Sequence, residues 1–331
     1  CVAIQNKRKI NTVQVKIIKK ESIVSKITAT GYLRGWPQVN ISSEIVGKIV
    51  KIYGQVGDSV KKGAILCQID DKEALANLKI SQARYEKVKR QYERARHLWE
   101  AKLLSRENFE DIECEYRIAE ADYHLAQERY RKTKIFAPIS GTITQINVEE
   151  GEIVIMGTMN NPGTQIMTVA NLSQMIAQVK ITESDMPFLY LNQKAFITVD
   201  ALPKQTFSAK VSEIGLMPVN YEQGIPNFTC ALEILEPSSE LKPGMKVKAE
   251  IITASRDSVL IVPLAALGEE DGKEVVYIYH GGTAKKVIVK TGITSELDVE
   301  ITLGLNVGDT IIIGPYKVLS RLTDGCEVSL K

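Results

Sequence analysis

The chain has few large aromatic side chains and no long apolar run. Its 331 residues include six Phe and two Trp, which argues against one large aromatic core. It has no stretch of 18 consecutive apolar residues, so no segment is predicted to cross a bilayer as a helix. At roughly 100–200 residues per domain, the length predicts several modules. Small β modules and a helical arm suit this composition best.

The sequence also lacks an excess of one charge and lacks paired cysteines. It has 42 Lys and Arg against 40 Asp and Glu, for a net charge of +2. No overall field therefore favours nucleic acid or acidic lipid as a partner. The five cysteines are far apart and form no C-x-x-C pair, so neither a zinc site nor a redox site is predicted. Cys67 and Cys230 lie in alternating apolar runs and are predicted to be buried thiols.

Motifs typical of enzymes are missing from the sequence. The three histidines are isolated, and there is no H-E-x-x-H, G-x-S-x-G or phosphate-binding G-x-x-x-x-G-K-[ST]. These motifs place metal ligands, nucleophiles or phosphate-binding amides at fixed spacings. We therefore expect no enzymatic activity, no metal and no cofactor.

The first residues permit more than one interpretation. The chain opens with Cys1-Val2-Ala3-Ile4. Cys1 could carry the lipid of a mature bacterial lipoprotein, or residues 1–4 could be the last turn of a truncated transmembrane helix. Either interpretation tethers the N-terminus to a membrane. The third alternative is an arbitrary start.

The most informative feature is an internal repeat. Residues 44–63 read EIVGKIVKIYGQVGDSVKKG and residues 138–157 read PISGTITQINVEEGEIVIMG. Each half has the glycines and alternating apolar residues of short strands joined by tight turns. Because one half buries too little apolar surface to be stable alone, the two are predicted to close into a small β-sandwich. The matched pairs, all 94 residues apart, are Gly47 with Gly141, Ile49 with Ile143, Ile52 with Ile146, Gly57 with Gly151, Val60 with Val154 and Gly63 with Gly157.

A helical segment, residues 72–133, separates the two halves. No Gly or Pro occurs from Ala64 to Ile135, and apolar residues recur in heptads, which is typical of a coiled coil. Ser105 resembles a helix N-cap, so we expect an antiparallel hairpin with arms of about 40 Å. Its many charges predict a solvated face. The expected seam comprises Leu75, Leu78, Gln82, Tyr85, Lys89, Tyr92, Arg96 and Trp99 in the first arm, and Phe109, Ile112, Tyr116, Ala119, Tyr123, Ala126 and Tyr130 in the second.

The rest of the chain has the pattern of a β protein. From Gln165 to Thr253, short alternating apolar runs separated by turns predict a six-stranded barrel. From Ser258 onward, further short strands follow.

A β-sandwich built from two such halves resembles the lipoyl or biotinyl carrier fold. With a helical hairpin inserted between the halves, it resembles the periplasmic adaptor family of tripartite efflux pumps, whose members are also called membrane fusion or HlyD-like proteins. The flanking segments Ala137 to Gly141 and Leu241 to Met245 resemble family segments, and the macrolide-type subgroup is the most similar. The resemblance implies a multidomain, mainly β fold with an inserted α-helical coiled-coil hairpin. The implied parts are a membrane tether or linker (1–9), a membrane-proximal β domain (10–35 and 255–331), a lipoyl-like β-sandwich in two halves (36–71 and 134–164), the hairpin (72–133) and a β-barrel (165–254). The resemblance also implies that strands near Thr12 to Ile18 and Ile23 to Gly31 belong to the sheet of the membrane-proximal domain.

The resemblance is most specific at the hairpin tip. Arg94, Leu98 and Ser105 match the family pattern of Arg, three residues, Leu, six residues and Ser or Thr. By resemblance, these side chains contact the outer-membrane channel. The alternative is that Arg94 is only a solvated charge, Leu98 the last residue of the seam and Ser105 a helix cap. In the loop from Gly157 to Gly163, Asn160 and Asn161 resemble a gate of the macrolide-type adaptors, although a plain surface turn fits them equally.

The resemblance also implies partners and a location. The chain is expected in the periplasm, tethered to the inner membrane by its N-terminus. It would connect an inner-membrane transporter with a TolC-like outer-membrane channel, as a ring of about six copies, a hexamer, and export small amphipathic compounds. The loop and the tip favour an ABC transporter over a proton-driven transporter of the resistance-nodulation-division type. A type I secretion adaptor is an alternative, although its hairpin is usually longer.

A lipoyl or biotinyl carrier is the remaining alternative. Such carriers bear a modified lysine in a tight turn, and Asp71-Lys72-Glu73-Ala74 superficially resembles that segment. Because Lys72 leads directly into the helical segment, this role is disfavoured.

Overall fold

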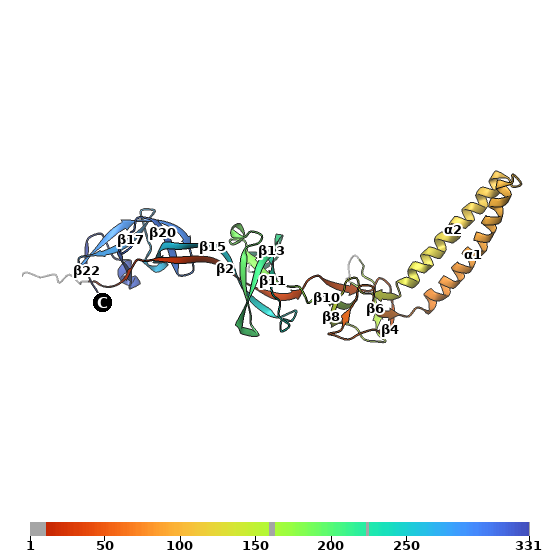
Figure 1. Ribbon diagram of the computed structural model, residues 1–331, viewed down its shortest axis with the longest axis horizontal. Helices are drawn as coiled ribbons and strands as arrows, with labels where there is room; N and C mark the ends of the chain where they lie inside the picture. Colours follow the sequence, from red (N-terminus) through yellow and green to blue (C-terminus); the bar gives the residue numbers. More distant parts are fainter. Residues whose placement is uncertain (1–10, 159–162, 223–224, 331) are drawn as a thin grey trace, which may run out of the picture. The chain divides into compact units, whose positions relative to one another are not determined.

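The structure, a computed structural model, describes residues 11–158, 163–222 and 225–330. These residues form two compact units. The sandwich–hairpin unit comprises residues 34–176 and 239–243, and the barrel unit comprises the remaining described residues. Strands predominate in the barrel unit, whereas the sandwich–hairpin unit combines short strands with the long helices α1 (Lys72–Glu100) and α2 (Arg106–Arg131), which run side by side (Figure 1). The expected mainly β fold with an inserted helical hairpin is confirmed. None of the described helices is long and apolar enough to cross a membrane.

The sandwich is built from two sheets whose inner faces form one core. Within the described residues, the strand orders are β3-β10-β8-β5 and β7-β6-β4-β9. Branched side chains such as Ile49, Ile143 and Ile166 point inward and are fully buried. The strands are β3 (Gln38–Ser42), β4 (Gly47–Ile52), β5 (Ser59–Val60), β6 (Ile65–Ile69), β7 (Lys134–Phe136), β8 (Gly141–Ile146), β9 (Ile153–Val154) and β10 (Gln165–Ala170).

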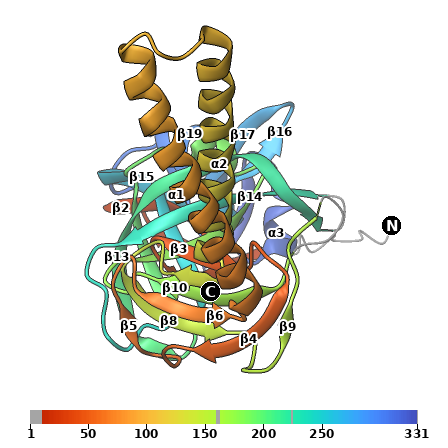
Figure 2. The ribbon, with the colours of Figure 1, turned by 90° about the vertical axis from the view of Figure 1, so that its right-hand side faces the viewer.

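The two halves of the repeat exchange strands. Strands β4 and β8 occupy equivalent positions 94 residues apart, and so do β5 and β9. Gly47 of β4 pairs with Val154 of β9, while Gly141 of β8 pairs with Val60 of β5. Each half therefore completes the sheet of the other, which explains why neither buries enough surface alone. Figure 2 shows β4 beside β9 and β5 beside β8.

The turn glycines are required by the backbone. Gly57 has φ +102° and Gly151 has φ +96°, a region that L side chains rarely adopt. Their amides make equivalent hydrogen bonds across the sandwich, from Gly57 N–H to the Ile143 carbonyl at 2.8 Å and from Gly151 N–H to the Ile49 carbonyl at 2.9 Å. The repeat is thus a repeat of backbone conformation as well as of sequence.

Aromatic rings join the two helices of the hairpin. Each step of seven residues along α1 meets a step of seven in the opposite direction along α2, as expected for an antiparallel coiled coil. The stacked pairs are Tyr85 with Tyr123 at 5.3 Å, Tyr92 with Tyr116 at 4.8 Å and Trp99 with Phe109 at 5.4 Å between ring centroids.

The seam of α1 differs from the expected one between these rings. Val88 and Ala95 are buried there, whereas Lys89 and Arg96 are exposed. The expected positions were wrong because the step from Tyr85 to the next buried residue is three and not four. In α2, the buried Ala119 and Ala126 agree with the prediction.

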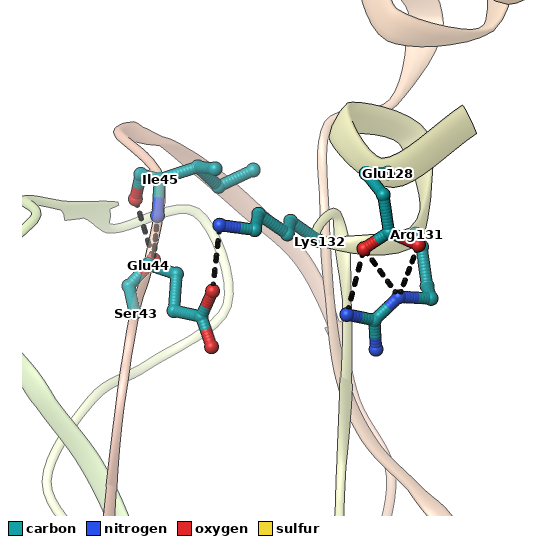
Figure 3. A network of polar contacts seen from close by, with 6 residues as sticks. All are labelled: Ser43, Glu44, Ile45, Glu128, Arg131 and Lys132. Atoms are coloured by element: carbon teal, nitrogen blue, oxygen red, sulfur yellow. Dashed lines mark hydrogen bonds and ion pairs between the residues drawn. The ribbon is translucent and has the colours of Figure 1, made fainter. Parts of the chain in front are cut away.

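The hairpin leaves the sandwich from two paired strands. Cys67 of β6 pairs with Ile135 of β7, so the chain enters and leaves the hairpin at neighbouring points. Just after α2, the Lys132 ammonium pairs with the Glu44 carboxylate of the sandwich at 2.9 Å (Figure 3). The preceding residue, Arg131, pairs with Glu128 one turn back in α2 at 2.9 Å and lowers the pKa of that carboxyl group.

A six-stranded barrel forms part of the barrel unit. In the described chain its strand order is β12-β13-β14-β11-β2-β15, and pairing of β12 with β15 closes it. The strands are β2 (Lys20–Gly35), β11 (Met175–Thr182), β12 (Lys194–Val199), β13 (Leu202–Glu222), β14 (Ile225–Ile234) and β15 (Lys246–Pro263).

Two strands lie elsewhere than expected. β10 begins at Gln165, where the barrel was expected to start, but it pairs with β3 and β8 of the sandwich. The segment near Ile23 to Gly31 was assigned to the membrane-proximal sheet, yet Lys26 to Tyr32 pair with Ile252 to Lys246 as a barrel strand. Both differences have the same cause, because these strands pair with segments far away in the sequence.

The remaining strands form the other part of the barrel unit. β15 extends beyond the barrel and pairs with β20 (Asp298–Leu303), which pairs with β19 (Lys290–Thr294). A second sheet has the order β16-β17-β18-β22-β1-β21 in the described residues. Its strands are β1 (Asn11–Ile17), β16 (Gly268–Glu270), β17 (Lys273–His280), β18 (Thr283–Ile288), β21 (Thr310–Gly314) and β22 (Cys326–Leu330).

Candidate docking site at the hairpin tip

A short turn connects the two helices at the hairpin tip. Helix α1 ends at Glu100 and α2 begins at Arg106. Lys102 has φ +59°, and the Leu103 amide donates a hydrogen bond to the Leu98 carbonyl at 2.8 Å. The backbone therefore reverses within a few residues and leaves the Leu103 side chain 74% exposed.

Arg94 and Leu98 lie on the outward face of α1. They are four residues apart and so share one face of the helix. Leu98 is 45% exposed, whereas the seam ends on Trp99, which stacks on Phe109. The alternative that Leu98 is the last seam residue is therefore wrong. Arg94 is exposed and makes no hydrogen bond or ion pair with the described residues.

Ser105 begins the second arm. It has extended backbone angles, and its hydroxyl accepts a hydrogen bond from the Asn108 amide at 3.3 Å. The expectation that it caps the helix is confirmed, because an N-cap oxygen satisfies an amide that the helix leaves unpaired. The fold thus brings Arg94, Leu98 and Ser105 to the same end of the hairpin, and their binding role stays a prediction.

Leu103 was not among the predicted site residues. An apolar residue in an exposed turn between two helices is the signal that could have indicated it. Two nearby charges are already paired, since Arg96 contacts Glu100 at 3.0 Å and Arg106 contacts Glu110 at 2.6 Å. Leu98, Leu103 and Arg94 are exposed at the tip together with Lys102, which likewise makes no ion pair with the described residues.

The other predicted sites differ in what can be said of them. Cys1, Asn160 and Asn161 lie outside the described residues. Lys72 is the first residue of α1, so it does not occupy the tight turn that a carrier lysine needs. The described residues contain no group of three or more His, Cys, Asp or Glu placed to hold a metal ion.

The buried cysteines agree with prediction. Cys67 and Cys230 are at most 1% exposed. Burial raises the pKa of Cys67 to about 11 and that of Cys230 to about 12, because the thiolate loses its hydration in an apolar core. They act as core side chains.

Models of known domain families match three successive parts of the chain. Residues 37–165 match the "RND MFP, barrel-sandwich hybrid domain". Residues 175–251 match the "YknX-like beta-barrel domain", and residues 258–317 match the "RND MFPs, C-terminal permuted SH3 domain".

Curated relatives cover most of the chain. The macrolide export protein MacA of Yersinia pestis is 26% identical over 92% of this chain and 89% of its own length. The MacA protein of Escherichia coli O157:H7 is 24% identical over 92% of this chain and 90% of its own length. The pyoverdine export membrane fusion protein PvdR of Pseudomonas putida is 24% identical over 90% of this chain and 88% of its own length.

Solved structures have the same fold. A MacA–MexA chimeric protein, which contains the Pseudomonas aeruginosa MexA α-hairpin domain, superposes with a TM-score of 0.76 at 25% identity, over 89% of this chain and 99% of that one. MacA from Actinobacillus actinomycetemcomitans superposes with a TM-score of 0.64 at 24% identity, over 91% of this chain and 99% of that one. Together with the interrupted sandwich, the capped hairpin and the closed barrel, these matches show that the chain belongs to the membrane fusion protein family, in its macrolide-type subgroup.

Proposed function

We propose that this chain is the periplasmic adaptor of an efflux pump, linking an inner-membrane transporter to a TolC-like outer-membrane channel for export of small amphipathic compounds. The observation that carries the proposal is the hairpin tip. Its seam is closed internally by stacked rings, yet Leu98 and Leu103 remain exposed beside the unpaired Arg94. A solvated turn would not need two exposed leucines, and exposed apolar side chains rimmed by polar groups are typical of an interaction site.

Each tip residue has a separate part in the proposed contact. Leu98 and Leu103 offer apolar side chains that can fill holes between the helices of a channel. Arg94 offers a charge-assisted hydrogen bond to a carbonyl or carboxylate oxygen. Ser105 fixes the start of α2 through its bond to Asn108, and this keeps the turn in one conformation.

The proposed transporter is of the ABC type. Similarity to proteins named for macrolide export supports this assignment, because the macrolide-type adaptors that the sequence resembles serve an ABC transporter. The alternative is a proton-driven transporter of the resistance-nodulation-division type. Purification of the tagged full chain from its native membrane, followed by mass spectrometry, distinguishes them. Co-purification of a subunit with nucleotide-binding motifs supports the ABC type, whereas a partner lacking them contradicts it.

The tip is tested by a strain that carries Arg94→Asp with Leu98→Ser. We expect efflux of a pump substrate to fall at least about ten-fold, as expected if about 1.4 kcal/mol of docking energy is lost. The matched control is Lys87→Asp with Ile118→Ser, which makes the same kinds of change at exposed positions in the middle of the hairpin. Normal efflux in the tip variant, with protein level and membrane location equal to the parent, would contradict docking through the tip.

A further inference from the structure

The layers of the coiled coil that lie between the stacked rings become smaller towards the sandwich. The two layers nearer the tip contain Ile112 or Val88, whereas the two layers at the base contain no side chain of that size and polarity. Small side chains on both arms leave a coiled coil unfilled at that height. From tip to base, at steps of seven residues along each arm, the layers are Ala95 with Ile112, Val88 with Ala119, Ser81 with Ala126, and Ala74 with Thr133.

A groove of about 550 Å³ lies at the two unfilled layers, and we call it the base groove. All four side chains of these layers line it. Their hydroxyl groups are satisfied locally, since Ser81 donates to carbonyl groups of α1 at 3.0 Å and Thr133 donates to the Tyr130 carbonyl at 2.7 Å. These hydroxyl groups therefore need no partner in the groove. The volume lies within the range of ligand pockets, roughly 300–1,000 Å³.

Apolar side chains continue from the floor of the base groove to its rim. Ile80 of α1 and Leu125 of α2 are 69% and 53% exposed, and Val46, from the loop before β4, is 65% exposed. The ion pair of Glu44 with Lys132 connects this loop to the end of the hairpin (Figure 3). Three segments of the sandwich–hairpin unit thus surround one apolar space. Exposed apolar side chains around a concave surface are typical of a ligand site.

The charged residues of the base groove favour a cation. Three carboxylates and two guanidinium groups line it, and one of each is already paired, since Arg84 lies 3.5 Å from Asp122. The carboxylates of Asp70 and Glu73 and the Arg129 guanidinium are exposed and have no ion pair among the described residues. The excess of negative charge beside apolar side chains suits a ligand with one positive charge and an apolar body.

We propose that the base groove binds an amphipathic organic cation, with its apolar body between Ile80 and Leu125 and its positive charge near Asp70 and Glu73. The apolar body takes the place that larger side chains have in the layers nearer the tip. The inference deepens the proposed function and rests on it for the identity of the ligand, because it names cationic compounds as a class of cargo that the adaptor itself holds. Binding as such requires neither a transporter nor a channel.

Filling the base layers tests the site. In Ala74→Leu with Ser81→Leu, the added side chains occupy the groove, so the thermal melt of the helices should be at least as high as in the parent. The probe is rhodamine 6G, a fluorescent amphipathic cation, and its anisotropy with the purified full chain measures the affinity. We expect the affinity to fall at least about ten-fold, because the apolar body loses its place.

The matched control for the filled variant is Ala83→Leu, which adds the same side chain at an exposed position of α1 that does not line the base groove. It should bind rhodamine 6G as the parent does. A parent that does not bind the dye, or a filled variant that binds it as tightly as the parent, would overturn the proposal.

The charge of the ligand is tested separately. Glu73→Gln keeps the size of the base groove and removes one carboxylate, so rhodamine 6G should bind about two- to five-fold more weakly. Glu93→Gln, at an exposed position outside the groove, is the control. Fluorescein, which has a related ring system and negative charge, should bind the parent more weakly than rhodamine 6G. Equal affinity of the parent for the two dyes would contradict a cation site.

Efflux separates this inference from the proposed function. Lost efflux in the tip variant Arg94→Asp with Leu98→Ser, together with dye binding by the parent that the filled variant lacks, supports both. Lost efflux in the tip variant without dye binding by the parent refutes this inference and leaves the proposed function intact. Dye binding together with normal efflux in the tip variant supports the base groove as a cation site and contradicts docking through the tip.

Discussion

Glu300 on β20 is a buried carboxylate with a complete set of partners. Its side chain is 4% exposed and lies 3.0 Å from the Arg256 guanidinium of β15. It also accepts a hydrogen bond from the Ile293 amide of β19 at 2.9 Å. The Ile293 bond, aided by Arg256 and opposed by burial, lowers the pKa of Glu300. One side chain thus connects three strands of the barrel unit.

We expect Glu300→Gln to lower the free energy of unfolding at neutral pH by about 1–3 kcal/mol, because buried partners lose a charged acceptor. In the parent, a lowered pKa stabilises the fold above the unfolded-state pKa of Glu, and this stabilisation is lost as pH falls through the folded-state pKa. The variant should lose that part of the acid dependence. Denaturant unfolding between neutral and acidic pH, with the exposed Glu327→Gln as control, measures this. Parallel stability profiles for the parent and Glu300→Gln would contradict it.

The cysteines should differ in reactivity. A maleimide near neutral pH should label the exposed Cys114 before Cys67 and Cys230, because these two are buried and their raised pKa values leave almost no thiolate. Mass spectrometry of the native and the denatured protein measures the order of labelling. Equal rates for Cys114 and Cys230 in the native protein would show that the core is more open than the structure indicates.

At the scale of the elements, the hairpin shows which residues of a coiled-coil seam can be predicted from the sequence alone. The α2 seam followed directly from its unbroken apolar heptads. In α1, the pattern identified the aromatic positions but not Val88 and Ala95, because the choice between a step of three and a step of four depends on the facing helix. The tip spacing indicated Arg94, Leu98 and Ser105, whereas the exposure of Leu98 and Leu103 required the structure.

The α1 register predicts unequal effects of neighbouring substitutions. Tyr92→Ala removes a ring stacked on both Tyr116 and Phe109 and should destabilise the hairpin by about 2 kcal/mol, less than for a fully buried ring. Lys89→Ala, at an exposed position, should have little effect. Thermal loss of helical circular dichroism compares the two. A larger effect of Lys89→Ala would restore the register first expected from the sequence.

Strands β2 and β10 mark the limit of prediction at this scale. The residues of β2 were expected in the membrane-proximal domain and those of β10 in the barrel, so each was assigned to the wrong neighbour. Alternation shows that a strand has one buried face, but not which distant segment lies beside it. The closed barrel needs β2 from the beginning of the chain, and this could be known only from the pairing of Gly31 with Val247.

At the scale of the whole molecule, the exchanged strands make the sandwich independent of the continuity of the chain. A protease cut in the turn between Glu100 and Arg106 should leave the two fragments associated, because β4 pairs with β9 and β5 with β8. Size-exclusion chromatography of the nicked protein should give the elution volume of the intact chain. Fragments that separate without denaturant would show that the pairings are weaker than this topology implies.

The strands that precede and follow the hairpin, β6 and β7, pair with each other, so the length of the hairpin can vary without disturbing the sandwich. Because Cys67 and Ile135 stay neighbours whatever lies between them, seven residues inserted in each arm would extend the tip by about 10 Å and keep the ring stacking in phase. Matched insertions in the two arms therefore leave the sandwich unchanged. The length of the hairpin can therefore change during evolution in steps of one heptad per arm, without any change in the sandwich that carries it.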